Sequence, residues 1–258
     1  MASLKRALVA ITVLIGIAST AANADHGKIY HWARTSNPFT LITQEHLSEP
    51  WKTHLKAAAS AWNTSSVLDL SILFIPPKQQ SCRVQTGVIV VCNGAFGRNG
   101  VWGSAQIWVK GVHITQAVVR LNDTYMFSGE SGTTSWRQYL MCQELGHAFG
   151  LNHQDENNFN TSLKTCMDYQ ATLMHSEEEK PNEHDYEELE KIYAHLDATT
   201  TVAGSGTKSS SAFPRNGDVT HPSQWGKLMH ESRDGRHARY ELDLGNDEKL
   251  VTHAVRGR

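Results

Sequence analysis

The sequence has no excess of positive charge, and this excludes one large class of function. Its 258 residues include 24 lysine and arginine residues against 26 aspartate and glutamate residues, a formal net charge of −2. Proteins that bind nucleic acid neutralise phosphates with a basic surface, which this composition does not supply. We therefore expect no nucleic-acid partner. Hydrophobic residues make up 40% of the chain, enough for a packed core, so a disordered chain is also excluded.

The apolar run near the start of the chain is too short to cross a membrane. It covers residues 7–18, whereas a membrane-spanning helix needs roughly 20 residues. Two basic residues precede the run, and Ala22-Asn23-Ala24 follows it as a small-residue cleavage site. This order predicts a signal peptide over residues 1–24 and a secreted protein, extracellular or periplasmic. No stable membrane insertion is expected after cleavage.

Cysteine is scarce, and its spacing argues against a zinc cluster built on cysteine alone. The chain has four cysteines, and no two of them form a C-x2-C pair. An even number in a chain sent to an oxidising compartment suggests two disulfides, for which three pairings are possible. We favour Cys82 with Cys92 and Cys142 with Cys166.

Composition divides the rest of the chain into three parts. Residues 25–197 are dense in structure signals and predict one main domain. Residues 198–218 are rich in threonine, serine and glycine, which predicts a flexible linker. Residues 219–258 hold three short strand-like runs, which predict a small β-rich C-terminal extension.

Apolar periodicity predicts three helices and several strands. The helices are expected at residues 51–62 with Ser48 as cap, after Ser135 up to Gly150, and at residues 183–195 with Asn182 as cap. Strands are expected at residues 68–75, 84–91, 104–109, 114–121, 227–231, 239–244 and 249–255.

The second helix carries the residues that point to chemistry. Residues 143–155 read QELGHAFGLNHQD and contain the spacing E-x2-H-x2-G-x2-H. Glu144 and His147 share a helix face, and Gly150 lets the chain reverse, so His153 returns to the same point. A zinc hydrolase needs this arrangement from one helix and the turn after it. The spacing therefore predicts Zn2+ bound by His147 and His153.

A second motif, Cys166-Met167-Asp168-Tyr169, follows as a methionine turn. Together the two motifs resemble the metzincin clan of zinc metallopeptidases, closest to matrixin-like secreted proteins, whose motif is H-E-x2-H-x2-G-x2-H. The resemblance covers most of residues 29–196. It implies an α+β fold, namely a metzincin-like zincin domain with a twisted mixed sheet, three main helices and a cleft. It also implies an edge strand, here residues 114–121, along which an extended peptide pairs its backbone.

Two features of that family are missing. No cysteine lies between Asp25 and Ser81 to form a cysteine switch, and Gln143 stands where the family has its first histidine. Position 143 is one helical turn before His147, so its side chain points at the same metal, although an amide oxygen is the poorer donor. Two alternatives stay open. In the first, the site works, with either Gln143 or a residue that replaces it as the third ligand. In the second, the site is degenerate.

The same resemblance implies roles for the neighbouring residues. Glu144 is expected to act as general base for a zinc-activated water and to pass the proton to the leaving amine. Tyr169 is expected to contact the metal or the oxyanion, the alternative being a buried tyrosine that bonds a backbone group. Met167 is expected to pack beneath the metal. Asp155 and Asp168 either orient a histidine or, as we favour, hydrogen-bond the local backbone.

Other histidines carry no such signal. Six of the fourteen have no ligand spacing, and we expect each to be a surface residue or a satisfied core residue. They are His31, His46, His54, His113, His184 and His195.

These observations predict a secreted zinc metalloendopeptidase that acts on a peptide or protein substrate as a monomer. Its expected ligands are Gln143, His147 and His153, and its expected catalytic residues are Glu144 and Tyr169. The alternative is a catalytically degenerate, metzincin-like secreted binding protein. A structural metal site is a third possibility, which Glu144 disfavours because a pure scaffold has little use for a carboxylate there.

Overall fold

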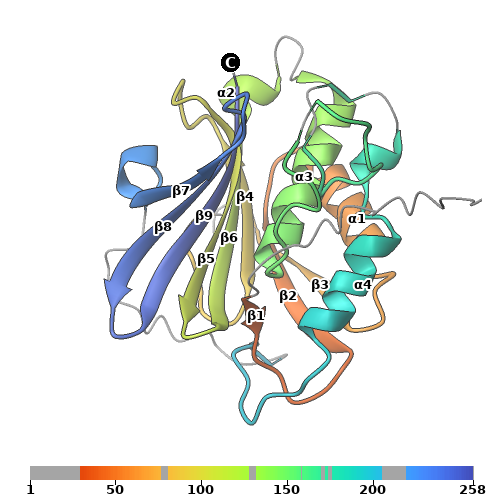
Figure 1. Ribbon diagram of the computed structural model, residues 1–258, viewed down its shortest axis with the longest axis vertical. Helices are drawn as coiled ribbons and strands as arrows, with labels where there is room; N and C mark the ends of the chain where they lie inside the picture. The colour runs from red at the N-terminus through yellow and green to blue at the C-terminus, as the bar shows by residue number, and fades with distance from the viewer. Residues whose placement is uncertain are drawn as a thin grey trace, which may run out of the picture.

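A computed structural model describes most of the chain: residues 30–76, 81–127, 132–157, 159–169, 172–173, 176–204 and 219–257. The expected signal peptide, residues 1–24, and most of the expected linker lie outside these residues. The described residues form one large mixed sheet with helices against it (Figure 1). The fold is therefore mixed α+β, as the sequence predicts.

The sheet has nine strands, eight of them in the order β3-β2-β4-β6-β5-β9-β8-β7. β3, β2, β4 and β6 are parallel, and each pair from β6 to β7 is antiparallel. Short β1 pairs in parallel with the start of β6. The strands are β1 (His31–Trp32), β2 (Phe39–His46), β3 (Leu68–Phe74), β4 (Ile89–Gly94), β5 (Val101–Lys110), β6 (His113–Asn122), β7 (Lys227–Glu231), β8 (His237–Gly245) and β9 (Glu248–Arg256).

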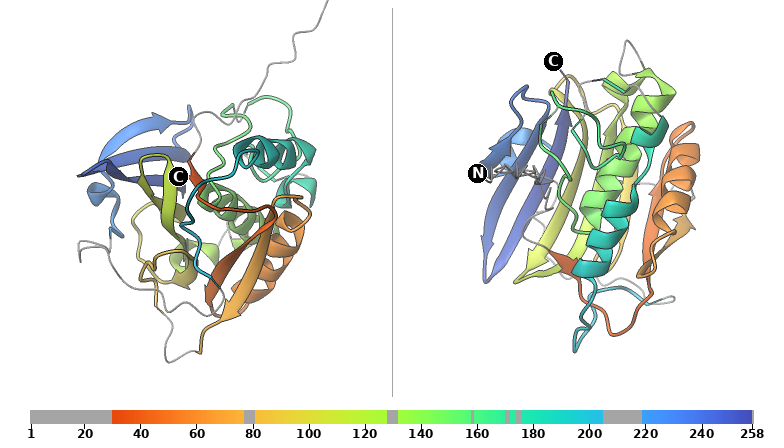
Figure 2. Two further views of the ribbon diagram at one scale, coloured as in Figure 1. Left: turned by 90° about the horizontal axis from the view of Figure 1, so that it is seen from below. Right: turned by 45° about the vertical axis from the view of Figure 1, so that its right-hand side comes forward.

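Three longer helices cover one face of the sheet (Figure 2). α3 contacts α1 on one side and β5, β6 and β9 on the other, so it is the central helix and is buried from Gln138 to Ala148. α1 presents Trp51, Leu55 and Trp62 to the same core. The helices are α1 (Trp51–Trp62), α2 (Asp123–Met126), α3 (Thr134–Ala148) and α4 (Glu183–Ile192), with helical turns at Ser176–Glu179 and Pro222–Gln224.

The expected helices are present, with two differences at their ends. Ser48 does not cap α1, because its backbone N–H donates to Asn93 Oδ1 at 2.8 Å and its hydroxyl accepts from Asn93 Nδ2 at 2.9 Å. α4 ends at Ile192, earlier than the expected residue 195. The predicted Asn182 cap of α4 is confirmed.

β6 is an interior strand, which corrects the expectation that residues 114–121 form the edge strand. It lies between parallel β4 and antiparallel β5. β5, the antiparallel strand beside α3, is not an edge strand either. β9 pairs with it from Val101 opposite Arg256 to Lys110 opposite Glu248. The C-terminal strands β7, β8 and β9 therefore continue the main sheet.

The far face of the sheet carries a second apolar core. Val90 and Val118 point to the face opposite Ile89 and Val119, because side chains alternate along a strand. Trp225 and other residues of the C-terminal part pack there. The C-terminal strands thus share both cores of the molecule.

Both favoured disulfides are present, Cys82–Cys92 and Cys142–Cys166. The start of the expected linker is hydrogen-bonded to the main sheet region, since Thr201 N–H donates to Ala33 O and Ala203 N–H donates to Gly87 O, both at 2.9 Å. Within the described residues, none of the helices combines the length and apolar character that crossing a membrane requires.

Candidate functional site

The end of α3 positions the first part of the candidate site. Thr133 caps the helix start by accepting a hydrogen bond from Trp136 N–H. At the other end Gly150 has φ +101°, and a Cβ there would collide with the carbonyl oxygen of Tyr30. Only glycine fits this close turn, which brings His153 back toward His147.

The two motif histidines meet as the sequence predicts. Their Nε2 atoms lie 3.1 Å apart, close to the separation of about 3.3 Å expected for two imidazoles bound to one tetrahedral zinc ion. The Nδ1 atom of His147 lies 2.8 Å from Leu151 O, so it carries the proton and leaves the Nε2 lone pair available.

His253 on β9 joins this pair, and the sequence interpretation missed it. One ligating nitrogen of each of His147, His153 and His253 lies within 4.8 Å of the others. The His253 ring stacks on the His147 ring, with centroids 4.0 Å apart. No local spacing could have indicated this residue, because it reaches the site only through the pairing of β9 with β5, where it stands opposite Ala105.

Gln143 has a fixed orientation. Tyr139 donates its hydroxyl proton to Asp168 O at 2.8 Å, so the hydroxyl accepts from Gln143 Nε2 at 2.9 Å. The amide nitrogen therefore faces Tyr139. Gln143 Oε1 is buried and has no hydrogen-bond partner among the described residues. An uncompensated buried acceptor one helical turn before His147 is compatible with a cation at this place.

Glu144 is the buried carboxyl group of the site. It is fully inaccessible to solvent, and within the described part of the chain no side chain hydrogen-bonds either oxygen. Burial raises the pKa of Glu144 well above its ordinary value, and the backbone amide of Ala105 opposes this shift. Such a carboxyl group is costly in a folded protein unless it has a chemical use.

Tyr169 lies over the histidines. Its ring meets the His153 ring edge-on at 4.2 Å and stacks on the His237 ring at 3.9 Å, both measured between centroids. Burial raises the pKa of the Tyr169 hydroxyl, and burial lowers the pKa of His237 to about 3 and that of His253 well below its ordinary value. His237 and His253 are therefore neutral, and neutral imidazole is the form that binds metal.

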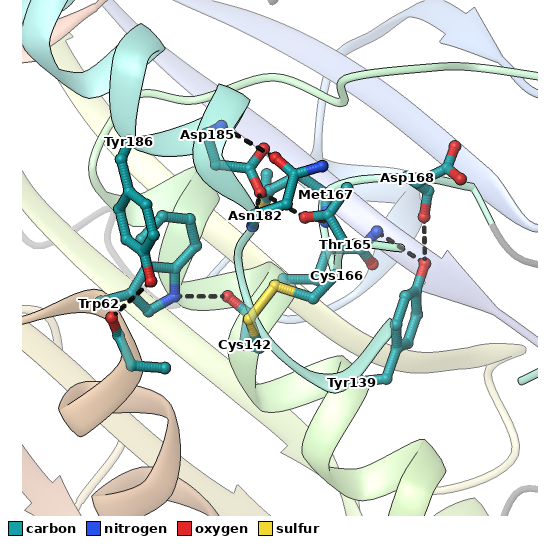
Figure 3. The surroundings of a disulfide bond; sticks show 12 residues. Trp62, Tyr139, Cys142, Thr165, Cys166, Met167, Asp168, Asn182, Asp185 and Tyr186 are labelled. Atoms are coloured by element: carbon teal, nitrogen blue, oxygen red, sulfur yellow. Dashed lines mark hydrogen bonds between the residues drawn. A yellow bond between two sulfur atoms is a disulfide. The ribbon is translucent and has the colours of Figure 1, made fainter. Parts of the chain in front are cut away.

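A disulfide anchors the methionine turn to α3. Cys142–Cys166 joins the helix to the turn, as Figure 3 shows beside Tyr139 and Asp168. Met167 packs against Gly146, where a Cβ would collide with its sulfur atom. Met167 therefore packs against the helix that carries His147, and its place beneath the metal stays a prediction.

The two motif aspartates bond the local backbone, as expected. Asp155 Oδ1 accepts from Asn157 N–H and Asp168 Oδ2 accepts from Leu163 N–H, each at 2.8 Å. Three of the histidines expected to be ordinary residues, His31, His113 and His195, gather around Asp197. His31 is buried and bonded to Asp197, and the side chains of His113 and His195 are 35% and 53% exposed.

The site is covered in this structure. Gln143, Glu144, His147, His153 and His253 are each at most 7% exposed. β5, the strand beside them, is paired with β6 on one side and β9 on the other. A peptide has no free backbone edge on β5 with which to pair.

Comparisons with known proteins add little to this geometry. No family model matches the chain, and no curated protein matches it. Among solved structures, high choriolytic enzyme 1, a hatching enzyme zinc-protease from the medaka fish Oryzias latipes, aligns with a TM-score of 0.27 and 15% identity. The alignment covers 48% of this chain and 50% of that chain, about half of each.

Proposed function

We propose that the chain is a secreted, zinc-dependent metalloendopeptidase of metzincin type that acts as a monomer on a peptide or protein substrate. One observation carries the proposal: the Nε2 atoms of His147 and His153 lie 3.1 Å apart, beside a buried carboxyl group on the same helix. The two disulfides are compatible with a secreted protein.

The donor set suits zinc. His147, His153 and His253 offer imidazole nitrogens, and Gln143 adds a buried amide oxygen that has no other partner among the described residues. Imidazole is a preferred zinc ligand, whereas calcium and magnesium select oxygen. His253 also supplies a third imidazole, which the family motif takes from the position that Gln143 occupies here.

When bound, zinc acts as a Lewis acid that acidifies a water molecule and polarises a carbonyl group. Glu144 then has two tasks: its carboxylate takes a proton from water and delivers that proton to the nitrogen of the leaving amine. The role assigned to Tyr169, whose ring lies against His153, is to donate a hydrogen bond from its hydroxyl group to the substrate carbonyl oxygen. The surrounding apolar core excludes bulk water.

The covered site implies that this form is inactive. Four protein ligands complete a tetrahedral zinc site and leave no position for water or substrate, which is typical of closed structural sites. A working site needs His253 and β9 to move away, which would also free the edge of β5 for a peptide.

Zinc content and peptide cleavage test the proposal. We expect one zinc ion that His147→Ala removes, and we expect cleavage of an unfolded protein substrate that His147→Ala abolishes. A His184→Ala variant serves as control, because this half-buried histidine on α4 lies outside the site. If the chain binds no zinc ion that His147→Ala removes, the proposal is refuted.

A second function, a catalytically degenerate binding protein, is favoured by the complete burial of Glu144 and the stacking of His253 on His147. The variant Gln143→His separates the two. A large gain of cleavage from an inactive parent would identify a degenerate site, and unchanged cleavage by an active parent would identify a competent glutamine site.

A further inference from the structure

We propose that His31, His113, His195 and Asp197 form a second zinc site, one that shares no residue with the first. The four side chains come from three separate segments: β1, the first residue of β6, and the chain that follows α4. Figure 1 places β1 at the lower end of the sheet, near the lower end of α4. Only folding brings these residues together, so their spacing in the sequence gave no sign of a site.

The same atom of each histidine turns inward. Nε2 of His31, His113 and His195 lies 3.4, 3.2 and 3.7 Å from Asp197 Oδ1. Nε2 of His195 also lies 3.2 Å from Nε2 of His31. One ligating atom of each of His31, His113 and Asp197 lies within 4.8 Å of the others, and the His31 ring meets the His113 and His195 rings edge to face at 87° and 88°.

The Nε2–Oδ1 distances of His31 and His113, 3.4 and 3.2 Å, are long for hydrogen bonds and also suit two ligands of one metal ion. Hydrogen bonds from charged nitrogen to carboxylate measure about 2.7–2.9 Å. The other oxygen of the same carboxylate provides the comparison: Asp197 Oδ2 accepts from Arg34 Nη1 at 2.7 Å. The Oδ1 contacts are longer and scatter around the value of about 3.3 Å that separates ligand atoms of a tetrahedral zinc ion.

Arg34 holds the carboxylate in the orientation that a ligand needs. Its guanidinium group and its backbone N–H both donate to Asp197 Oδ2, the latter at 3.1 Å. The same guanidinium group donates to the carbonyl oxygen of His195. Oδ1 is thus directed to the histidines, and hydrogen bonds of this kind fix the ligands of metal sites.

The ligand set identifies the metal and the role. Three imidazoles and one carboxylate oxygen suit zinc, and four protein ligands make a closed, structural site. His113 and His195 have side chains 35% and 53% exposed, so an ion can enter from solvent. A bound ion would tie the two-residue strand β1 to the chain after α4, across 166 positions of sequence between His31 and Asp197.

Zinc content of the full purified chain, equilibrated with zinc and desalted, tests the second site. We expect two ions per chain, one of which is lost in His195→Ala and in His113→Ala. The control His184→Ala, another partly exposed histidine, should keep both. Retention of the ion at His147 shows that each variant has folded.

The variant His147→Ala distinguishes this inference from the proposed function. If it keeps one ion that a further His195→Ala change removes, the second site holds even where the first fails. If zinc is lost with His147 alone and His195→Ala has no effect, the second site is refuted. Cobalt substitution gives an independent signal, because a tetrahedral site with nitrogen ligands would add visible absorption that His195→Ala removes.

Discussion

A change at Glu144 can separate catalysis from metal binding. The change Glu144→Gln preserves the shape of the side chain and removes the base, so peptide cleavage should fall by about 10²–10⁴-fold while zinc content stays the same. Cleavage rate and zinc content measured on one preparation check this. Glu188→Gln, at another buried glutamate on α4, is the matched control. Cleavage that survives Glu144→Gln would remove this residue from the reaction.

His253 should affect the metal and the activity in opposite directions. Removing it in His253→Ala deletes one imidazole from the closed site, so zinc should bind at least about tenfold more weakly, a loss of about 1.4 kcal/mol. Peptide cleavage at saturating zinc should rise, because an open position becomes available. Competition with a chelator and a cleavage assay measure the two effects. His184→Ala, on α4 and outside the site, should change neither.

Local spacing predicted one part of the site and not the other. Gln143, Glu144 and His147 follow from the helical repeat, and His153 follows from the turn at Gly150, so the short stretch of residues 143–153 contains all the necessary information. His253 depends on which strand pairs with β5. That choice is made by the two apolar cores of the whole sheet, and no pattern around residue 253 expresses it.

At the scale of elements, the start of α4 predicts a pH dependence. Asp185 is fully buried and completes the capping box with Asn182, and Thr165 donates its hydroxyl hydrogen bond to the carboxyl group. Burial raises the pKa of Asp185 to about 6, against the opposing hydrogen bonds from Thr165 and Asn182. The folded state therefore holds the proton more firmly than the unfolded state, whose pKa is about 3.9.

The direction of the pH dependence of stability follows from this difference between the folded and unfolded pKa of Asp185. The contribution of Asp185 to stability is complete below about pH 4 and is lost as the pH rises through 6, by about 3 kcal/mol in total. The measurement is the free energy of unfolding in urea at pH 4.5 and pH 7, for the parent and for Asp185→Asn. The stability of the parent relative to the variant should decrease at the higher pH. A difference independent of pH would contradict the buried, protonated carboxyl group.

Elements with strong apolar patterns were predictable, and β2 was not. Its second half, Gln44-Glu45-His46, is polar in sequence and buried in the fold. These groups are satisfied by partners from elsewhere, since Gln44 bonds Gln85 and Glu45 pairs with Lys52. A strand that buries paired polar groups has no alternating pattern to identify it.

At the scale of the whole molecule, the two proposed zinc ions would join parts that are far apart in the chain. One connects α3 with β9, and the other connects β1 and β6 with the segment after α4. Binding that requires the folded state stabilises it by about 2.7 kcal/mol per site when free zinc is a hundred times the dissociation constant. A chelator should therefore lower the melting temperature by roughly 5–10 °C for each site. Calorimetric melting with and without chelator measures the shift. His195→Ala and His147→Ala should each lose about half of it, and the double variant should lose all of it. If a chelator leaves the melting temperature of the parent protein unchanged, neither site contributes to the stability of the fold.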